Sequence, residues 1–539
     1  MKKGKAKIEK IDHLGIVAGV IRELRIIETI DKLIGTDDKE IITTGEAVAG
    51  MILNGLGFTS RALSLTPQFF ETKAVGRLIR EKIEPKSLNR FKLGRSLDKI
   101  FDYGCEKFFS SISILVCKKE NIDTKFSHGD TSSFSLNGEY ESDFDSQPVK
   151  IVRGYSKDKR SDLKQIILEL VNTQDGGMPT LMKTWSGNES DSNILRKRVK
   201  AFINEFKHGE SPRCFVADSK LYDKKTSSFL KQINFVTRIP STIKLGRECV
   251  EKSLGEEGPW KQINEKNKIK MFPVTHYGIK QRWVVVYSQA SHNRAIKSVQ
   301  NSVDREKESV NKIFSKLKRQ KFACKEDANT CLNGIKKKLI YHEIQNININ
   351  ECKVYDKPGR PKKNSSRIEY QIDGTVSSIQ SIISKKIEHK SCFVLTTNYS
   401  EKQLPTDEVL DAYKGQDCVE KGFAFLKSPD FFVASLFVKN TSRIQGLLTI
   451  MTLSLLVYSV AQRRLRKQLK RYGKTVPNQI NQPTKRPTMK WIFQTFEGIY
   501  FLTTNIANVV EKSIEGLNDY RIGVIKLMGP SVAAVYDII

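Results

Sequence analysis

The stretch Ala412–Pro429, AYKGQDCVEKGFAFLKSP, decides how the rest of the chain is interpreted. At about 100° per helical residue, four of its polar residues fall within an arc of roughly 60°. These are Tyr413, Gln416, Glu420 and Lys427. Three apolar residues lie beside this stripe and would form its buried edge: Val419, Phe423 and Leu426. The pattern predicts a helix, and on its own it is also typical of an ordinary amphipathic helix with a solvated polar face.

The overall charge favours an anionic partner. The chain has 539 residues, with 91 Lys and Arg against 60 Asp and Glu, and a formal net charge of +31. The default partner of so basic a globular protein is nucleic acid, although a generally Lys-rich proteome is an alternative. Nine cysteines are present without a Cys-x-x-Cys pair, which favours free thiols in a reducing cytoplasm.

One apolar segment has the minimum length of a membrane span. Ile444–Ala461 contains no charged residue, and this length lies at the lower limit for a transmembrane helix. Its several Thr, Ser and Gln residues and its place late in a basic chain favour a helix buried inside a large domain. We therefore expect no membrane partner.

The chain divides into five regions by its pattern. Residues 1–112 predict a helical N-terminal domain, because apolar residues recur at spacings of three and four. This domain is either a DNA-binding module or a helical oligomerisation domain. Residues 236–395 have a different character, with strand-like pieces around a long charged helical stretch and a basic loop, YDKPGRPKKNSS. That loop is either an exposed linker or a minor-groove hook.

Residues 113–235 predict an α/β pattern with a mixed sheet. Four strand-like segments come first: FSHGDTSSFSL, PVKIVRGYS, QIILELVNT and MPTLMKTWSG. Asp175-Gly176-Gly177 predicts a hairpin between the last two of these segments. A helix over 190–206 follows, with Ser190 or Asp191 as its cap, and then a strand and a further helix.

Three carboxylates stand out by their context. Asp130 lies in the first strand-like segment, Asp218 ends the apolar strand of CFVADSKLY, and Glu420 lies on the striped helix. Carboxylates at strand ends of an α/β sheet lie where such folds bind ligands, and oxygen ligands suit Mg²⁺ or Mn²⁺. Two such ions can support in-line attack on phosphorus. Taken singly, each acid is better explained as a cap or a surface charge, and it is the combination of the three that favours a metal site.

These motifs together resemble the DDE transposases of bacterial insertion sequences. The spacing from Tyr413 to Lys427 is similar to the Tyr-Arg-Glu-Lys signature of the insertion-sequence-four superfamily, with Gln416 in the place of Arg. The segments VEKGFAFLKSPDFF, GDTSSFSLNGEY, GYSKDKRSDLKQ and FVADSKLY resemble the insertion sequence 1634 branch of that superfamily. The resemblance extends over nearly the whole chain.

The resemblance implies a ribonuclease H-like catalytic core interrupted by an insertion domain. The core would comprise 113–235 and 396–475, the insertion domain 236–395, and a C-terminal helical tail 476–539. Asp130, Asp218 and Glu420 would be the catalytic metal ligands for two Mg²⁺ or Mn²⁺ ions. The DNA-binding residues would be Tyr413, Gln416 and Lys427, of which Tyr413 and Lys427 would hold phosphates.

The implied function is DNA transposition by a cytoplasmic, nucleoid-associated enzyme. It would bind the terminal inverted repeats of its mobile element, cleave the ends by metal-dependent hydrolysis and join the 3′-hydroxyls to target DNA. A homodimer would hold the two ends of double-stranded DNA. Two alternatives remain, namely a non-catalytic DNA-binding derivative and a related ribonuclease H-like nuclease without a joining step.

Overall fold

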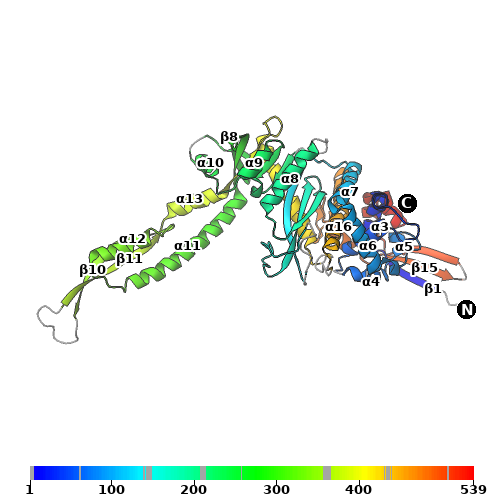
Figure 1. The fold of residues 1–539 in the computed structure, drawn as a ribbon, viewed down its shortest axis with the longest axis horizontal. Coiled ribbons are helices and arrows are strands. Elements are labelled where there is room, and N and C mark those ends of the chain that lie inside the picture. The colour runs from blue at the N-terminus through cyan, green and yellow to red at the C-terminus, as the bar shows by residue number, and fades with distance from the viewer. Residues whose placement is uncertain are drawn as a thin grey trace. The chain divides into compact units, whose positions relative to one another are not determined.

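The structure is a computed structural model whose described residues form two compact units. The described residues are 5–59, 62–137, 140, 149–206, 214–255, 258–355, 366–429, 431, 438, 440–506 and 509–538. Unit 1 comprises Met1–Thr237 and Asp411–Ile539, and unit 2 comprises Arg238–Leu410 (Figure 1). The expected insertion domain, 236–395, differs from unit 2 mainly at its end, which lies at residue 410.

Unit 1 is built on a mixed sheet in the order β4-β3-β2-β5-β6. Its strands are β2 (Phe126–Leu136), β3 (Lys164–Thr173), β4 (Pro179–Ser186), β5 (Cys214–Ala217) and β6 (Phe235–Arg238). The first three strands pair antiparallel, β5 runs parallel to β2, and β6 runs parallel to β5. The mixed α/β class predicted from the sequence is therefore confirmed.

Three of the four predicted strands are present, and one prediction is wrong. FSHGDTSSFSL coincides with β2, and β3 and β4 form the predicted hairpin, with φ values of 79° at Gly176 and 66° at Gly177. In PVKIVRGYS, whose first residue lies outside the described residues, the rest forms only an isolated bridge between Val152 and Gln165. Because β2 and β4 already pair with the two edges of β3, no continuous edge remains for another strand.

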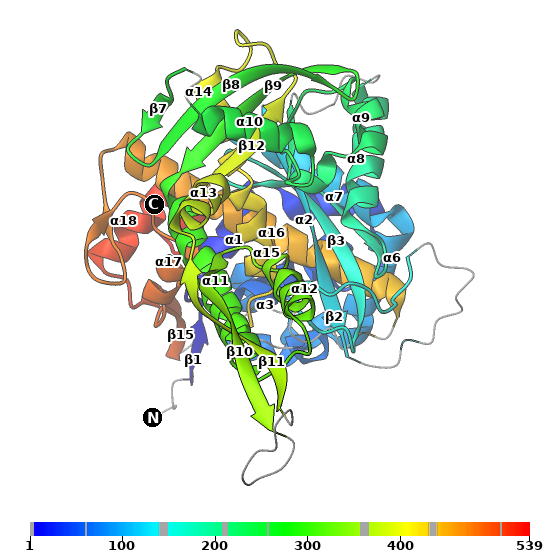
Figure 2. The same ribbon diagram turned by 90° about the vertical axis from the view of Figure 1, so that its left-hand side faces the viewer.

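Helices cover both faces of this sheet (Figure 2). On one face, α8 (Asp191–Phe206) packs Phe202 edge-on against Phe215 of β5, with ring centroids 5.2 Å apart. Helix α9 (Lys224–Leu230) contacts α8. On the other face, α15 (Asp417–Leu426) contacts β2 and β3, while α7 (Cys105–Glu120) and α16 (Thr441–Arg471) contact β4.

Helix α16 contains the apolar segment that the sequence analysis assigned to a buried core helix. Among the described residues it is the one helix long and apolar enough to cross a membrane, and 94% of its most apolar window is buried inside the protein. The prediction of a buried helix is therefore confirmed.

The N-terminal and C-terminal regions share one apolar core with the sheet. The N-terminal region contains β1 (Lys5–Lys10), α1 (Leu14–Glu23), α2 (Ile26–Ile34), α3 (Thr44–Leu56), α4 (Thr66–Phe70), α5 (Val75–Leu78) and α6 (Arg90–Tyr103). The C-terminal region contains α17 (Met489–Thr495), β15 (Tyr500–Ile506), β16 (Val509–Glu515), α18 (Asp519–Met528) and α19 (Pro530–Val535). Strand β1 pairs with β15, so the N-terminal and C-terminal regions lie side by side (Figure 1).

The boundaries expected at 112 and 475 therefore fall inside unit 1, where a single core continues across them. The C-terminal tail, which was expected to be helical, also contributes β15 and β16 to a three-stranded sheet with β1.

Unit 2 combines antiparallel strands with long helices. Its strands β12 (Cys392–Thr397), β9 (Ile279–Ser288), β8 (Asn267–His276) and β7 (Lys261–Asn264) are neighbours in that order. Its helices are α10 (Lys244–Leu254), α11 (Gln289–Leu317), α12 (Lys325–Lys336) and α13 (Gln380–Ser391). The hairpin of β10 (His342–Tyr355) and β11 (Ser366–Ser378) lies alongside α11 (Figure 1). Most of the basic loop YDKPGRPKKNSS lies outside the described residues.

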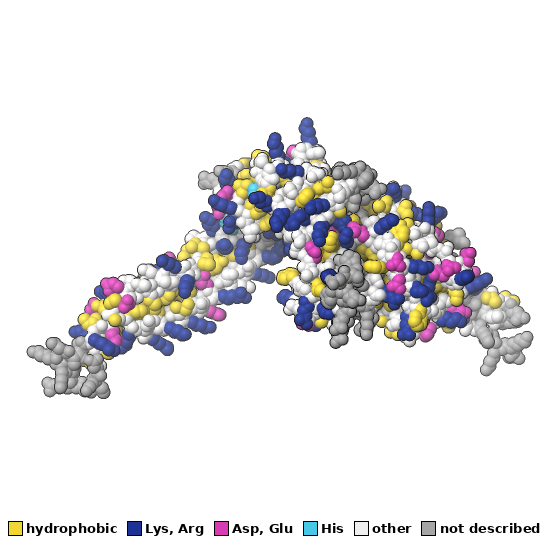
Figure 3. All heavy atoms as spheres, viewed as in Figure 1, with side chains coloured by type: hydrophobic (Ala, Val, Ile, Leu, Met, Phe, Trp, Pro, Cys, Tyr) yellow, Lys and Arg dark blue, Asp and Glu magenta, His cyan; other side chains and the backbone are white. Residues whose placement is uncertain are grey.

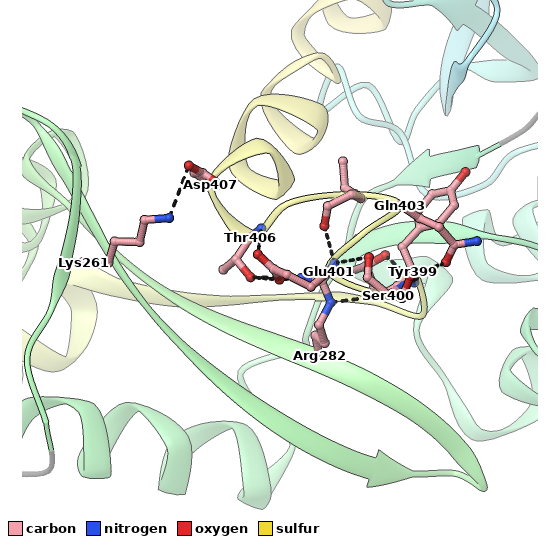
Figure 4. A network of polar contacts seen from close by, with 10 residues as sticks. Lys261, Arg282, Tyr399, Ser400, Glu401, Gln403, Thr406 and Asp407 are labelled. Atoms are coloured by element: carbon pink, nitrogen blue, oxygen red, sulfur yellow. Dashed lines mark hydrogen bonds and ion pairs between the residues drawn. The ribbon is translucent and has the colours of Figure 1, made fainter.

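Arg282 of β9 fixes the loop that leads from β12 to α14 (Thr406–Lys414) (Figure 4). Its guanidinium donates to the carbonyl of Tyr399 at 2.8 Å and to the Thr406 hydroxyl at 2.9 Å, and it pairs with Glu401. Glu401 also accepts from the Thr406 backbone N–H at 2.9 Å, which caps the start of α14. One arginine thus holds both sides of this loop.

A buried ion cluster fastens α8 to the sheet. Arg198 of α8 donates to Glu169 of β3 at 2.8 and 3.1 Å and to Glu106 of α7 at 3.0 Å. The side chains of Arg198 and Glu169 are 1% and 0% exposed. Trp185 donates to Glu169 at 2.8 Å, so both carboxylate oxygens have partners.

Loss of one charge from this cluster should strongly destabilise unit 1. Glu169→Gln leaves the Arg198 guanidinium buried without its main counter-charge, which costs about 3–5 kcal/mol. We expect a clear fall in the thermal unfolding midpoint measured by circular dichroism. Glu106→Gln, at the partly exposed end of the cluster, serves as the matched control and should cost less. Equal midpoints for Glu169→Gln and the wild type would contradict the role assigned to the cluster.

Candidate active site

The parallel pairing of β2 with β5 brings Asp130 and Asp218 together. The register aligns Phe126 with Cys214 and His128 with Val216, so Asp130 and Asp218 follow at the same level. Asp218 comes directly after β5, and its carboxylate accepts the Lys220 backbone N–H at 3.0 Å. Two acids from distant parts of the sequence thus lie at the same level on two adjacent strands of the sheet.

The Asp130 carboxyl is partly buried beside two other acids, Asp218 and Asp191. Burial is the largest cause that raises the pKa of Asp130 above its usual value. The carboxylates of Asp218 and Asp191 raise this pKa further, while the Lys157 ammonium and the Thr131 N–H oppose them without prevailing. An added cation would oppose this rise in pKa, because a positive charge near a carboxylate favours its ionised form. The donor set of Asp130 and Asp218 therefore fits a hard divalent ion.

Asp191 is a third acid in this region, and the sequence analysis considered it only as a helix cap. Ser190 provides the cap instead, since its hydroxyl accepts the Asn193 N–H at 3.3 Å. The Asp191 carboxylate accepts from the Thr131 hydroxyl at 2.5 Å and pairs with Lys220. Burial by itself raises the pKa of Asp191, but these two bonds and the Lys157 charge outweigh it, and the pKa is lowered.

Two lysines partly neutralise the acids. The Lys157 ammonium lies 3.7 Å from an Asp130 oxygen and 3.5 Å from an Asp191 oxygen. Burial lowers the pKa of Lys220, but the carboxylates of Asp191, Asp218 and Asp130 together raise it above its usual value. Nothing in the local sequence marks these lysines or Asp191, because their roles depend on strand pairing.

Helix α15 lies alongside β2 from His128 to Phe134. A Cβ atom on Gly415 would lie 2.6 Å from the His128 ring, so only glycine allows this approach. Gln416 donates to the Gly129 carbonyl at 2.9 Å. At the other end of the helix, the Lys427 ammonium lies 5.4 Å from the centroid of the Phe134 ring. Asp130 is between these contacts along β2.

Glu420 lies on this helix between Gln416 and Lys427, and its side chain is exposed. Within the part of the chain that the structure describes, no group of three or more His, Cys, Asp or Glu residues is placed to hold a metal ion. The structure thus brings Asp130 and Asp218 together and puts Glu420 on the helix beside β2. It does not bring the three carboxylates into one ligand set.

The expected stripe belongs to two helices rather than one. Helix α14 ends at Lys414 and α15 begins at Asp417, so Tyr413 lies before the break and is half-buried. Gln416 lies at the break and is 7% exposed, and its amide is used to anchor the helix to β2. Contact of Tyr413 and Gln416 with DNA stays a prediction.

Lys427 is paired in this structure. Both oxygens of Asp158 accept from its ammonium at 2.9 Å. Asp158 and Lys157 both belong to GYSKDKRSDLKQ, a segment that carried the family resemblance without an assigned role. That segment therefore supplies one charge to Asp130 and another to Lys427.

The anchoring role of Gln416 can be separated from a surface role. Gln416→Ala leaves the Gly129 carbonyl without its side-chain donor, which costs about 1–3 kcal/mol for a buried polar group. We expect a lower thermal unfolding midpoint for this variant. Glu420→Ala on the exposed side of the same helix is the control, and its effect should stay within roughly 0.5 kcal/mol. Equal effects of the two substitutions would rule out the anchor.

His128 predicts an acid sensitivity of the fold. Burial lowers the pKa of His128 from 6.5 to about 4, although Gln174 and Gln416 oppose the shift. Below about pH 6.5, His128 binds a proton in the unfolded chain, whereas in the folded chain it does not bind one until about pH 4. Stability should therefore be complete above about pH 6.5 and fall between the two values. Thermal midpoints measured at pH 7.5 and pH 5 should differ less in His128→Gln than in the wild type.

The remaining pH dependence in that variant has a second source. Burial also lowers the pKa of His13 from 6.5 to about 4. If His128→Gln and the wild type lose the same stability on acidification, His128 does not contribute to the acid sensitivity of the fold.

Comparisons with known proteins give limited matches. Residues 6–114 match the family described as "Domain of unknown function (DUF4277)", and the match extends from β1 into α7. No curated protein matches the chain. Among solved structures, the chain is similar to the piggyBac transposase in a synaptic complex with hairpin DNA, studied by cryo-electron microscopy. The identity is 9%, the coverage is 91% of this chain and 82% of that chain, and the TM-score is 0.36, too low to establish a common fold.

Proposed function

We propose that this protein is a DDE-type DNA transposase, a metal-dependent enzyme that cleaves the ends of a mobile element and joins them to target DNA. The observation that carries the proposal is the placement of Asp130 and Asp218 side by side on two adjacent strands of the unit 1 sheet, where burial and the neighbouring carboxylates raise the pKa of Asp130. The helix that carries Glu420 lies along the same central strand.

The sheet supports this proposal through its order. Its central strand carries the first acid, and the adjacent parallel strand ends at the second. This arrangement is consistent with the ribonuclease H-like core that the family resemblance implies. In such a core the third acid comes from a helix packed on the sheet, which is the position of Glu420 on α15.

Asp130, Asp218 and Glu420 would hold one or two Mg²⁺ or Mn²⁺ ions. When bound, such ions supply charge stabilisation and an activated oxygen nucleophile for attack on phosphorus. Asp130 and Asp218 are already adjacent, and the exposed Glu420 side chain has rotatable bonds with which to approach them. Lys157 and Lys220 would remain with Asp191, which binds both of them.

The charge of the chain supports DNA as the partner. Lys and Arg side chains are spread over both units, and Asp and Glu lie among them (Figure 3). Lys427 would exchange its partner Asp158 for a DNA phosphate, since both are oxyanions of similar hydrogen-bonding capacity. Tyr413 would contact the same strand. Because both ends of an element must be cut and joined, a homodimer bound to double-stranded DNA in the bacterial nucleoid is the expected assembly.

A non-catalytic DNA-binding derivative is the second candidate. The observation that favours it is the pairing of Lys157 and Lys220 with the acids, together with the outward exposure of Glu420. A related nuclease without a joining step is distinguished by its products.

The proposal is tested with DNA that carries both ends of the element and with Mg²⁺ or Mn²⁺. Asp130→Asn, Asp218→Asn and Glu420→Gln should each reduce cleavage by roughly a hundredfold or more, as expected when a metal site loses a ligand. Asp411→Asn is the matched control, because Asp411 is an exposed acid of the neighbouring helix α14 outside the proposed ligand set. Joined product should appear in addition to cleaved DNA.

Three outcomes would decide against parts of this proposal. Wild-type cleavage by all three acid variants would exclude these ligands. Cleavage without joined product would favour the nuclease, and DNA binding without any cleavage would favour the non-catalytic derivative.

A further inference from the structure

A pocket of unit 1 lies beside α15, on a different side of the helix from Glu420. It has a volume of about 350 Å³. Its walls come from the β3–β4 turn, the α14–α15 junction, α16 and Arg486. Asp417 and Lys421 line it, each one residue after a member of the Gln416–Glu420 stripe and therefore rotated by about 100° from it.

The pocket has more positive than negative charge. It is lined by one acidic side chain, that of Asp417, and by four cationic side chains: Lys414, Lys421, Arg466 and Arg486. The acid is already engaged, because Asp417 pairs with Lys421. Among the described residues, no carboxylate pairs with Lys414, Arg466 or Arg486.

The two arginines lie close enough to repel one another. Burial is the main cause that lowers the pKa of Arg466, and the charge of Arg486 lowers it further. The Arg466 guanidinium is held in place by a bond from its Nε to the Pro487 carbonyl at 2.8 Å, which leaves its terminal nitrogens available. Two like charges held close together repel one another. An anion bound between the two guanidinium groups would make the net electrostatic interaction attractive.

The remaining lining suits a nucleotide strand. Phe425 and Tyr458 pack against each other with ring centroids 4.6 Å apart and contribute an aromatic surface. The Gln462 amide oxygen accepts the Met489 N–H at 3.0 Å, so its amide nitrogen remains as a donor. A cationic rim with aromatic side chains is the combination by which proteins hold the backbone and bases of a nucleic-acid strand.

We propose that this pocket binds a phosphate group of a DNA backbone through Arg466 and Arg486. The choice of DNA over another phosphate ester rests on the proposed function, whereas the anion site rests on the pocket itself. Guanidinium groups match phosphate geometry through paired N–H donors. Because the pocket includes residues of α15, a bound phosphate would also hold in place the helix that carries Glu420.

The test compares DNA binding by charge-matched variants in the presence of EDTA, where no metal-dependent cleavage occurs. Arg466→Gln/Arg486→Gln should weaken the binding of a fluorescent duplex by about tenfold and reduce the salt dependence of binding by roughly two phosphate contacts. Lys467→Gln/Lys470→Gln removes the same charge from exposed positions of α16 outside the pocket, and it should have a smaller effect. Fluorescence polarisation at two salt concentrations measures both quantities.

Arg486→Gln alone is the control for a folding defect in the double variant, because Arg486 is exposed and its substitution should not disturb the fold. It should still weaken binding by about threefold, with an unchanged thermal midpoint. Equal losses in the pocket and control variants, or no loss in Arg486→Gln, would overturn the proposal. The proposal would also be overturned if the pocket binds a small anion rather than DNA. In that case the pocket substitutions would abolish saturable binding of inorganic phosphate or a mononucleotide and leave the DNA affinity at the wild-type value.

Failure of this proposal and failure of the proposed function are distinguishable. The binding assay requires neither the ends of an element nor metal, so loss of binding in the pocket variants is informative even if no cleavage is ever observed. Conversely, metal-dependent cleavage by pocket variants with wild-type affinity would support the catalytic assignment and exclude the phosphate site.

Discussion

The parallel hydrogen bonding of β5 to β2 is the constraint on which the candidate site depends. It covers only the residues from Phe126 to His128 on one side and from Cys214 to Val216 on the other. Without it, Asp130 and Asp218 would have no reason to meet, because some 90 residues of chain separate them. Parallel pairing also requires a crossover, which β3, β4 and α8 provide, and α8 is fastened to the sheet by the buried Arg198–Glu169 pair.

Electrostatics then shape what the paired strands have brought together. Three acids and two lysines share the region around Asp130, and burial together with the Asp218 and Asp191 carboxylates keeps the pKa of Asp130 raised. The lysines pair most closely with Asp191, whose pKa is lowered. Asp130 therefore gains less from the lysines than Asp191 does, which is a suitable state for receiving a divalent cation.

Helix α15 connects the candidate site with the arginine-lined pocket. Gly415 and Gln416 hold its first turn against β2, and Lys427 reaches Phe134 at its other end. One side of the helix carries Glu420, and another contributes Asp417 and Lys421 to the pocket. Phosphate groups bound on one side would thus restrict the helix whose other side carries the proposed third ligand.

The sequence by itself determined the local features of this protein: the bounds of β2, the glycine hairpin between β3 and β4, the buried apolar helix α16 and the apolar edge of α15. These depend on residue periodicity and turn chemistry within a few positions. Only the tertiary structure decided that the helix breaks at Gly415, that 149–156 forms no strand, and that Lys157, Asp191 and Lys220 surround Asp130. The reason is that close approach, free strand edges and charge partners are set by residues far apart in the chain, which no local pattern encodes.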